Sequence, residues 1–413
     1  MSSVAVDDTP WYKTISLRQS GLLLALLGII VFFQILTGGR LLVPDNIASL
    51  VQQNAYVMIL AIGMMLVILL GHIDLSVGST VAMVGGVFGV LTASWGMNWV
   101  LAVGICLIVG VAVGAWQGFW VAYVGIPAFI VTLAGMLIFR GFAQLLVGRT
   151  ISGFDSGFIA IGNGSAPNVL GFTNTSAIGY LERVTLLLGV LGTISLVVSM
   201  VRGRRAKQKQ GLELESGAVF WGRAVVSAVI ILFFTYLLAN STGGFPIVLG
   251  IIGVLMLGFS WVLKNTSFGR NIYATGGNYH AAQLSGVNVK ATTFTVFILT
   301  VVLTAVAGIV VTSRAGAAVA IAGQGYELDA IAACFIGGAA VSGGVGRISG
   351  AMIGALIMGV LNMGLSILAV DPAWQQAIKG FVLLGAVAFD LIGEARRCLL
   401  YTSDAADDMQ CVD

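Results

Sequence analysis

A long apolar run that ends in a short polar segment constrains this fold more than any other feature of the sequence. Residues 55–70 are almost uninterruptedly apolar, and a second, shorter apolar run covers residues 81–91. The first run would cross most of a bilayer as a helix. The polar segment between the runs contains Asp74, His72 and three hydroxyl side chains. Polar groups at that depth are costly in lipid, so we expect them to face protein, water or a ligand.

A second break of this kind lies in the C-terminal half. Apolar residues 328–340 lead into the Gly/Ser-rich segment 342–350, and apolar residues 351–361 follow. Two broken hydrophobic hairpins, one in each half, are typical of a transporter built from an internal repeat. At the residue level the two breaks share only the order apolar, Gly, Ser, Gly, apolar. The glycines that define the second broken hairpin are Gly337, Gly338, Gly343, Gly344 and Gly346.

The composition places most of the chain in a membrane. Of the 413 residues, 58% are hydrophobic and 9% are charged, and the mean hydropathy is +1.02. Soluble domains contain about a quarter charged residues. The sequence therefore predicts an all-α polytopic membrane protein, with a cytoplasmic N-terminus (residues 1–19) followed by about 12 transmembrane helices in residues 20–397. The four cysteines have no metal-binding spacing, and we predict no metal site.

The basic residues indicate the topology. Five of them fall within eight residues: Arg202, Arg204, Arg205, Lys207 and Lys209. Such a run next to a membrane span usually marks the cytoplasmic side, although binding of nucleic acid or lipid headgroups is an alternative reading. With this loop inside, residues 264–290 and both termini are also cytoplasmic, and the polar residues 149–181 are external. We expect lipid contacts and no nucleic-acid partner.

Residues 398–413 do not fit this pattern. They are acidic and have no apolar period, and they directly follow the end of the last predicted helix. They resemble translated vector or adapter sequence, so we interpret them as a non-native tail without a function.

The cytoplasmic segment 264–290 contains the signals of a short helix. Asn278 has the side chain of an N-cap, Gly286 would stop the helix, and Ala281 and Ala282 would lie on its surface. A helix across the inner mouth with small surface residues is suited to docking. The residues alone leave an ordinary loop helix equally open.

Three segments resemble one known family. Residues 267–289 look like the coupling loop in the permease subunits of bacterial monosaccharide ABC importers of the ribose/xylose/galactose class. Residues 72–79 resemble the signature of that family, and residues 336–346 are similar to its C-terminal motif. The family commonly has Gly at the position of His72, and often Arg at the position of Gln283. The resemblance covers roughly residues 20–148 and 246–395. The region between, residues 181–243, looks like the extra helix pair of the xylose and multiple-sugar branch.

The resemblance implies a permease subunit that moves a monosaccharide, xylose or a related pentose or hexose, across the bacterial inner membrane. It further implies a permease homodimer, a periplasmic sugar-binding protein, and a cytoplasmic ATP-binding subunit that binds the ATP. This chain has no P-loop motif, so we expect no cofactor in it and no enzyme activity. The residues assigned to coupling with the ATPase are Gly276, Gly277, Asn278, Ala281, Ala282, Leu284, Ser285 and Gly286.

Asp74 has two possible roles. It could contact sugar hydroxyls in the translocation pathway, or it could cap the half-helix that begins within residues 76–80. Asp-x-Ser before a helix is cap chemistry and favours the second role. Ser76, Gly78 and Ser79 are assigned to the same pathway or cap.

The main alternative function is an ion-coupled secondary sugar transporter. It would need several membrane-embedded carboxylates arranged as a relay, and in the sequence only Asp74 qualifies. We interpret Glu327 and Asp329, at the outer end of the second hairpin, as solvated or capping residues rather than as proton carriers.

Overall fold

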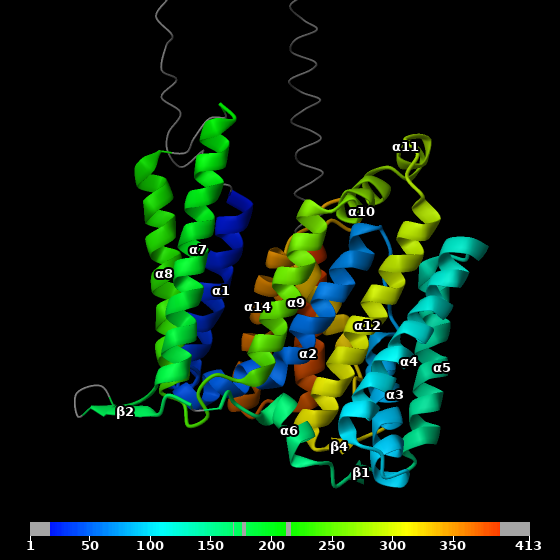
Figure 1. The fold of residues 1–413 in the computed structure, drawn as a ribbon, viewed down its shortest axis with the longest axis horizontal. Coiled ribbons are helices and arrows are strands. Elements are labelled where there is room, and N and C mark those ends of the chain that lie inside the picture. Colours follow the sequence, from blue (N-terminus) through cyan, green and yellow to red (C-terminus); the bar gives the residue numbers. More distant parts are fainter. Residues whose placement is uncertain (1–16, 168, 176–178, 212–215, 389–413) are drawn as a thin grey trace, which may run out of the picture.

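The computed structural model describes residues 17–167, 169–175, 179–211 and 216–388. The predicted tail, residues 398–413, and most of the predicted N-terminal segment, residues 1–19, lie outside the described residues. The axes of the long helices are roughly parallel, as in a membrane protein (Figure 1). One end of the molecule holds α10 and α11, and the opposite end holds α6 and the short strands.

The helices in chain order are α1 Leu17–Leu36, α2 Pro44–Leu69, α3 Val77–Gly89, α4 Trp99–Phe119, α5 Ala128–Val147, α6 Ser156–Asn163, α7 Arg183–Lys209, α8 Gly217–Ala239, α9 Ile247–Asn265, α10 Ser267–Gly277, α11 Tyr279–Leu284, α12 Val289–Ala315, α13 Tyr326–Ile336 and α14 Ile348–Ile367. The π-helical segments Val90–Ser94 and Trp120–Val124 extend α3 and α4, and residues 372–388 are also helical. Strands β1 (Ile151–Ser152) and β4 (Ala317–Ala318) pair antiparallel, as do β2 (Phe172–Thr175) and β3 (Gly179–Glu182).

The all-α multi-pass architecture is confirmed, but the number of spans differs from the prediction of about 12. Among the described residues, nine helices are long and apolar enough to cross a membrane. Three predicted spans do not reach that length. The apolar part of α1, Gly21–Leu36, is shorter. Predicted span 328–340 folds as the 11-residue α13, and span 377–392 is only partly described.

The basic loop and the segment 264–290 lie at the same end of the molecule. The C-terminal end of α7, which contains the five basic residues, points to the end where α10 and α11 lie (Figure 1). The region 149–181 contributes β1, α6 and β2 to the opposite end. This arrangement agrees with the sidedness predicted from the basic residues. The predicted extra helix pair corresponds to α7 and α8, which pack against each other on one flank of the bundle.

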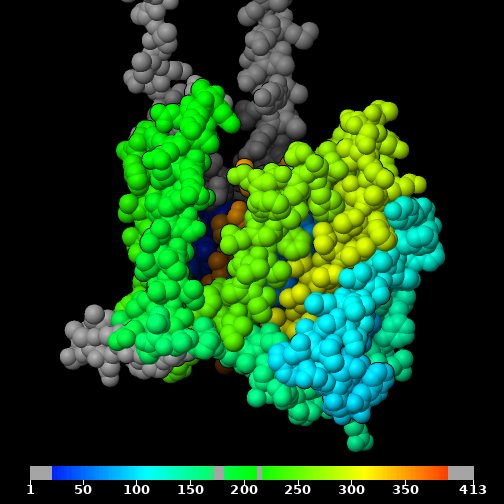
Figure 2. All heavy atoms as spheres, in the orientation of Figure 1, coloured from blue at the N-terminus to red at the C-terminus, as the bar shows by residue number. Residues whose placement is uncertain are grey.

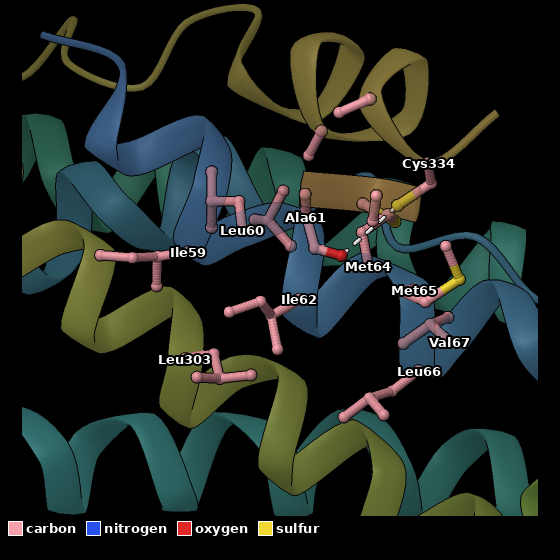
Figure 3. Close-up of a cluster of buried hydrophobic side chains, with 14 of the residues drawn as sticks. Ile59, Leu60, Ala61, Ile62, Met64, Met65, Leu66, Val67, Leu303 and Cys334 are labelled. Atoms are coloured by element: carbon pink, nitrogen blue, oxygen red, sulfur yellow. Dashed lines mark hydrogen bonds between the residues drawn. The ribbon is translucent and has the colours of Figure 1, made fainter. Parts of the chain in front are cut away.

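Helix α2 forms the centre of the bundle. Every residue from Ala55 to Leu69 is buried, including the small residues Ala61 and Gly63. A Cβ at Gly63 would lie 3.3 Å from the backbone of Thr300 on α12, so the two helices are in close contact. The Cys334 thiol of α13 donates a hydrogen bond to the Ala61 carbonyl at 3.4 Å (Figure 3). The apolar run that dominates the sequence is therefore enclosed by protein.

Both breaks produce short helices inside the bundle. Residues 71–76 have no regular structure, and α3 begins only at Val77. Gly71 contacts the loop after α13, whereas Gly78 contacts Gly323 and Glu327 at the beginning of α13. Residues 71–76 therefore run alongside α13, which is about 16 Å long at 1.5 Å per residue. Helices α3 and α13 consequently start next to each other in the interior and run to opposite ends.

Candidate functional site

The short helix predicted after Asn278 is present in the segment between α9 and α12. Helix α11 begins after Asn278, whose Oδ1 accepts a hydrogen bond from the Ala281 N–H at 2.9 Å. Gly286 has a φ of +84°, a left-handed conformation that favours glycine and ends the helix. The cap and the stop predicted from the sequence are thus both confirmed as local structure.

The exposed face of α11 differs from the predicted one. Ala282 is buried at 4% exposure, so the prediction that it lies on the surface is wrong. Adjacent positions on a helix point about 100° apart, and here Ala281 faces outward while Ala282 faces the protein. Leu284 is 89% exposed. The outward face of α11 therefore combines a small residue with a large apolar one at the surface of this end (Figure 2).

Glycines from three distant segments meet at the C-terminal end of α10. The Gly344 N–H donates a hydrogen bond to the Leu69 carbonyl at 2.9 Å. A Cβ at Gly344 would lie 2.8 Å from the Cα of Gly277, and a Cβ at Gly276 would overlap the Leu69 carbonyl oxygen. A Cβ at Gly343 would lie 2.8 Å from the backbone nitrogen of Gly71. We call Gly71, Gly276, Gly277, Gly343 and Gly344 the glycine junction.

The glycine junction joins all three sequence motifs through backbone contacts. Gly71 opens the first break, Gly343 and Gly344 belong to the second, and Gly276 and Gly277 end α10. At Gly276, Gly343 and Gly344 a Cβ would come closer to neighbouring backbone atoms than real Cβ atoms essentially ever do. Four of the five glycines, all except Gly71, were candidate site residues from the sequence, but their contact was not predicted.

Tyr273 adds a side-chain contact that the sequence analysis missed. Its hydroxyl donates a hydrogen bond to the Gly346 carbonyl at 2.9 Å. Burial raises the pKa of the Tyr273 phenol above its ordinary value, so the group keeps its proton and remains a donor. The only sequence signal was its position one helical turn before Gly276 and Gly277. Tyr273 therefore ties α10 to the second break.

Gly337 and Gly338 lie outside the glycine junction, at the end of α13, where they form a turn. A Cβ at Gly337 would lie 2.6 Å from the backbone nitrogen of Ala351. Gly338 has a φ of +85° and lets the chain turn directly after the helix. These two glycines allow α13 and α14 to pack closely, so the second break keeps a fixed shape.

Asp74 is fully buried and organises the start of α3. Its Oδ1 accepts hydrogen bonds from the Ser76 N–H at 2.8 Å and from the Ser76 hydroxyl at 2.7 Å. Gln117 Nε2 of α4 donates to the same hydroxyl at 2.6 Å. Ser76 is the N-cap residue of α3, and its side chain makes no cap bond within that helix. The geometry is thus a hydrogen-bonded turn before the helix rather than a cap within it, and the cap role of Asp74 stays a prediction.

Asp74→Leu is expected to lower the amount of folded protein, whereas Asp74→Asn should be mild. Leucine would leave the buried Ser76 N–H without its acceptor, at a cost of about 1–3 kcal/mol, while asparagine keeps an oxygen there. The measurement is the yield of monodisperse protein after mild detergent extraction, together with uptake. A well-folded Asp74→Leu variant that no longer transports, or that prefers another sugar, would instead place Asp74 in the pathway.

The two half-helices meet in a polar region. Gly78 and Ser79, in the first turn of α3, are buried, and Gly78 lies against Gly323 and Glu327. Arg140 of α5 donates hydrogen bonds to the carbonyls of Ala320 and Ala322, at 2.9 and 2.7 Å. The guanidinium therefore holds the irregular segment that precedes α13.

Asp329 corrects one interpretation made from the sequence. It is 2% exposed rather than solvated. Its Oδ2 accepts a hydrogen bond from the Tyr56 hydroxyl at 2.7 Å and forms an ion pair with Lys379 at 3.1 Å. Asp74 is therefore not the only buried carboxylate. Asp329 is paired with a cation, as a structural charge inside a membrane protein usually is.

Comparison with known proteins identifies the family. A family model described as "Branched-chain amino acid transport system / permease component" matches residues 46–387. The xylose transport system permease protein XylH of Escherichia coli (strain K12) is 39% identical over 379 residues, 92% of this chain and 93% of the relative. The chain belongs to the XylH/RbsC family, the permeases of carbohydrate ABC importers.

Other relatives match this permease over equally long stretches. XylH of Haemophilus influenzae is 39% identical over 92% of the permease and 97% of its own length. The ribose import permease protein RbsC of E. coli (strain K12) is 33% identical over 94% and 99%. No solved structure matches the permease.

Membership of this family settles the class of protein. The permease is a transport component and not an enzyme, and the sequence-based assignment to the ABC importer class is confirmed. In this family ATP is generally handled by a separate ATPase, and an importer permease implies an ATPase and a binding protein as partners.

Proposed function

We propose that this permease carries a monosaccharide, xylose or a related pentose or hexose, into the cytoplasm of a bacterium through its inner membrane. The 39% identity to xylose permeases over 92% of the chain is the observation that supports the sugar class most directly. An uncharged sugar is bound by hydrogen-bonding side chains and aromatic faces rather than by counter-ions. This requirement agrees with a chain in which only 9% of the residues are charged.

The proposed assembly is a permease homodimer embedded in lipid, with both termini in the cytoplasm. A cytoplasmic ATP-binding subunit would dock on α11, where Ala281 and Leu284 face outward. A periplasmic sugar-binding protein would dock at the opposite end, which holds α6 and the paired strands (Figure 1). The five basic residues at the end of α7 support this sidedness.

The proposed coupling route leads through the glycine junction. A movement of α11 would be passed to α10, because the Asn278 side chain caps α11 immediately after α10 ends. Gly276 and Gly277 would then push on both breaks at once through backbone atoms, since no side chains lie between them to absorb the movement. The two breaks precede α3 and α14, so the interior would respond as a unit.

We also propose an internal repeat, but with a pairing different from the one that the sequence suggested. Helix α2 is followed by an irregular segment and the half-helix α3, and α12 is followed by residues 316–325 and the half-helix α13. Helix α2 packs on α13 and α14, and α12 packs correspondingly on α3 and α4. Since α3 and α13 run to opposite ends, the two halves would be inverted relative to each other.

The test of this function is transport by proteoliposomes that contain the permease, its ATPase and its binding protein. Xylose uptake is expected only when ATP and the binding protein are both present, because the permease has no P-loop of its own. Omitting each component in turn provides the controls. Uptake driven by an ion gradient without the ATPase would support the secondary-transporter alternative and contradict the proposal.

A further inference from the structure

A small cavity lies in the outer half of the bundle, where α2, α12 and α13 come together. Its volume is about 120 Å³, and the polar and aromatic residues that line it are Gln52, Gln53, Tyr56, Arg314 and Tyr326. Arg314 lies in the last turn of α12, and Tyr326 is the first residue of α13. The cavity is therefore at the end of the molecule opposite the glycine junction. None of these residues was singled out from the sequence.

Two tyrosines form a flat aromatic wall. The rings of Tyr56 and Tyr326 stack with their centroids 3.6 Å apart and their planes inclined by 18°. The Tyr56 hydroxyl is held by Asp329 at 2.7 Å, and Lys379 holds the same carboxylate oxygen. The position of this wall is thus fixed by a buried ion pair rather than by packing alone.

Polar groups around the wall are free to bind a ligand. In the described part of the chain the buried Nε of Arg314 has no hydrogen-bond partner. An unpaired buried donor is costly unless a ligand or water satisfies it. Gln52 Nε2 donates to the Asn163 carbonyl at 3.2 Å, which orients that side chain and leaves its carbonyl oxygen as an acceptor. The adjacent Gln53 supplies an amide with two donors and one acceptor.

The cavity is smaller than a whole sugar. At about 30 Å³ per water in the liquid, 120 Å³ corresponds to about four waters, so the cavity would hold one edge of a sugar ring rather than enclose it. A pentose has about ten non-hydrogen atoms, five of them oxygens: four hydroxyls that donate and accept, and a ring oxygen that only accepts. Amide and guanidinium groups next to an aromatic face are suited to sugar hydroxyls and to the apolar face of a sugar ring.

We propose that this cavity is a sugar-binding subsite at the outer end of the pathway, where the permease first contacts the edge of a monosaccharide. The inference depends on the sugar class proposed above. It also gives the sugar a connection to the coupling machinery, because Tyr326 begins α13 and the loop that follows α13 contains Gly343 and Gly344. A sugar on the aromatic wall would contact one end of a half-helix whose other end leads to the glycine junction.

A larger cavity of about 310 Å³, at the outer ends of α3 and α4, is less suited to a sugar. Its polar side chains Asn98 and Asp155 already accept hydrogen bonds from the N–H groups of Val100 and Gly157 as helix caps. No stacked aromatic pair lies among the residues that line it. These groups are used by the fold, whereas Arg314 Nε is not.

The variants Gln53→Met, Arg314→Gln and Tyr326→Phe test the subsite in the full chain. The first two remove polar groups with little change in volume, and the third removes one hydroxyl and keeps the stacked ring. Gln144→Met is the matched control, because Gln144 is an exposed glutamine of α5 outside the cavity. Binding of D-xylose to the permease alone in lipid nanodiscs is followed by saturation-transfer NMR. Uptake is measured in proteoliposomes with the ATPase and binding protein.

The wild-type chain and Gln144→Met are expected to give the xylose signal. Gln53→Met and Arg314→Gln should weaken binding and uptake about tenfold, and Tyr326→Phe less. Variants that bind and transport like the wild type, while wild-type uptake is normal, would overturn the subsite alone. Binding of inorganic phosphate without binding of xylose would also overturn the subsite, because Arg314 would then bind anions. Absence of wild-type uptake of any pentose or hexose would instead contradict the proposed function.

Discussion

Ala281→Trp on α11 is expected to abolish ATP-driven uptake while leaving the membrane bundle intact. Ala281 faces outward on a helix that lies at the surface of the end assigned to the cytoplasm (Figure 2). A bulky side chain there would prevent α11 from seating in a cleft of the ATPase. Leu284→Asp is expected to act in the same direction, because it places a charge on the 89% exposed leucine and removes an apolar anchor.

The measurement compares ATPase pull-down and uptake with those of the unmodified chain. Ala206→Trp is the matched control, since Ala206 is also exposed at the same end, on α7. Loss of pull-down and of uptake by at least about tenfold is expected for the two α11 variants, corresponding to about 1.4 kcal/mol or more of binding energy. Full coupling in both would exclude α11 as the contact.

Gly344→Ala is expected to stop transport without preventing ATPase docking. The new Cβ would lie 2.8 Å from the Cα of Gly277, a distance that forces α10 away from the second break. Gly344 also has a φ of +71°, so alanine adds a strain of about 1–2 kcal/mol. The contact, rather than the strain, is predicted to be decisive, because it joins the end of α10 to the second break.

Gly96→Ala separates the contact from the strain. Gly96 has a φ of +63°, but a Cβ there meets no atom within 4 Å in the described part of the chain. Gly96→Ala should therefore transport nearly normally, whereas Gly344→Ala should retain pull-down and lose uptake. Similar activity in the two variants would contradict the role of the glycine junction.

Local signals in the sequence were read correctly where a few adjacent residues determine the outcome. Asn278 and Gly286 bound a helix because an N-cap oxygen and a left-handed glycine act within one turn. The basic residues at the end of α7 predict the cytoplasmic side from charge next to a span, and this sidedness stays a prediction. The resemblance of three short motifs led to the correct protein family.

The lengths of the membrane-embedded elements were predicted less well. The hydropathy of residues 328–340 does not show that the helix ends at Ile336. The turn is set by Gly337 and Gly338 and by the close contact with the backbone at Ala351. A hydropathy pattern reports that a segment is apolar. It does not report whether lipid or protein surrounds it.

The sequence by itself determined that this chain spans a membrane and where the short helix α11 begins and ends. Each of these properties depends on composition or on neighbours within a few residues. Only the tertiary structure decided that Gly343 touches both Gly71 and Gly276, that Asp329 is paired with Lys379, and that Tyr56 stacks on Tyr326. These contacts join residues 50 to more than 250 positions apart. Their partners are chosen by the packing of whole helices, and no local pattern encodes that choice.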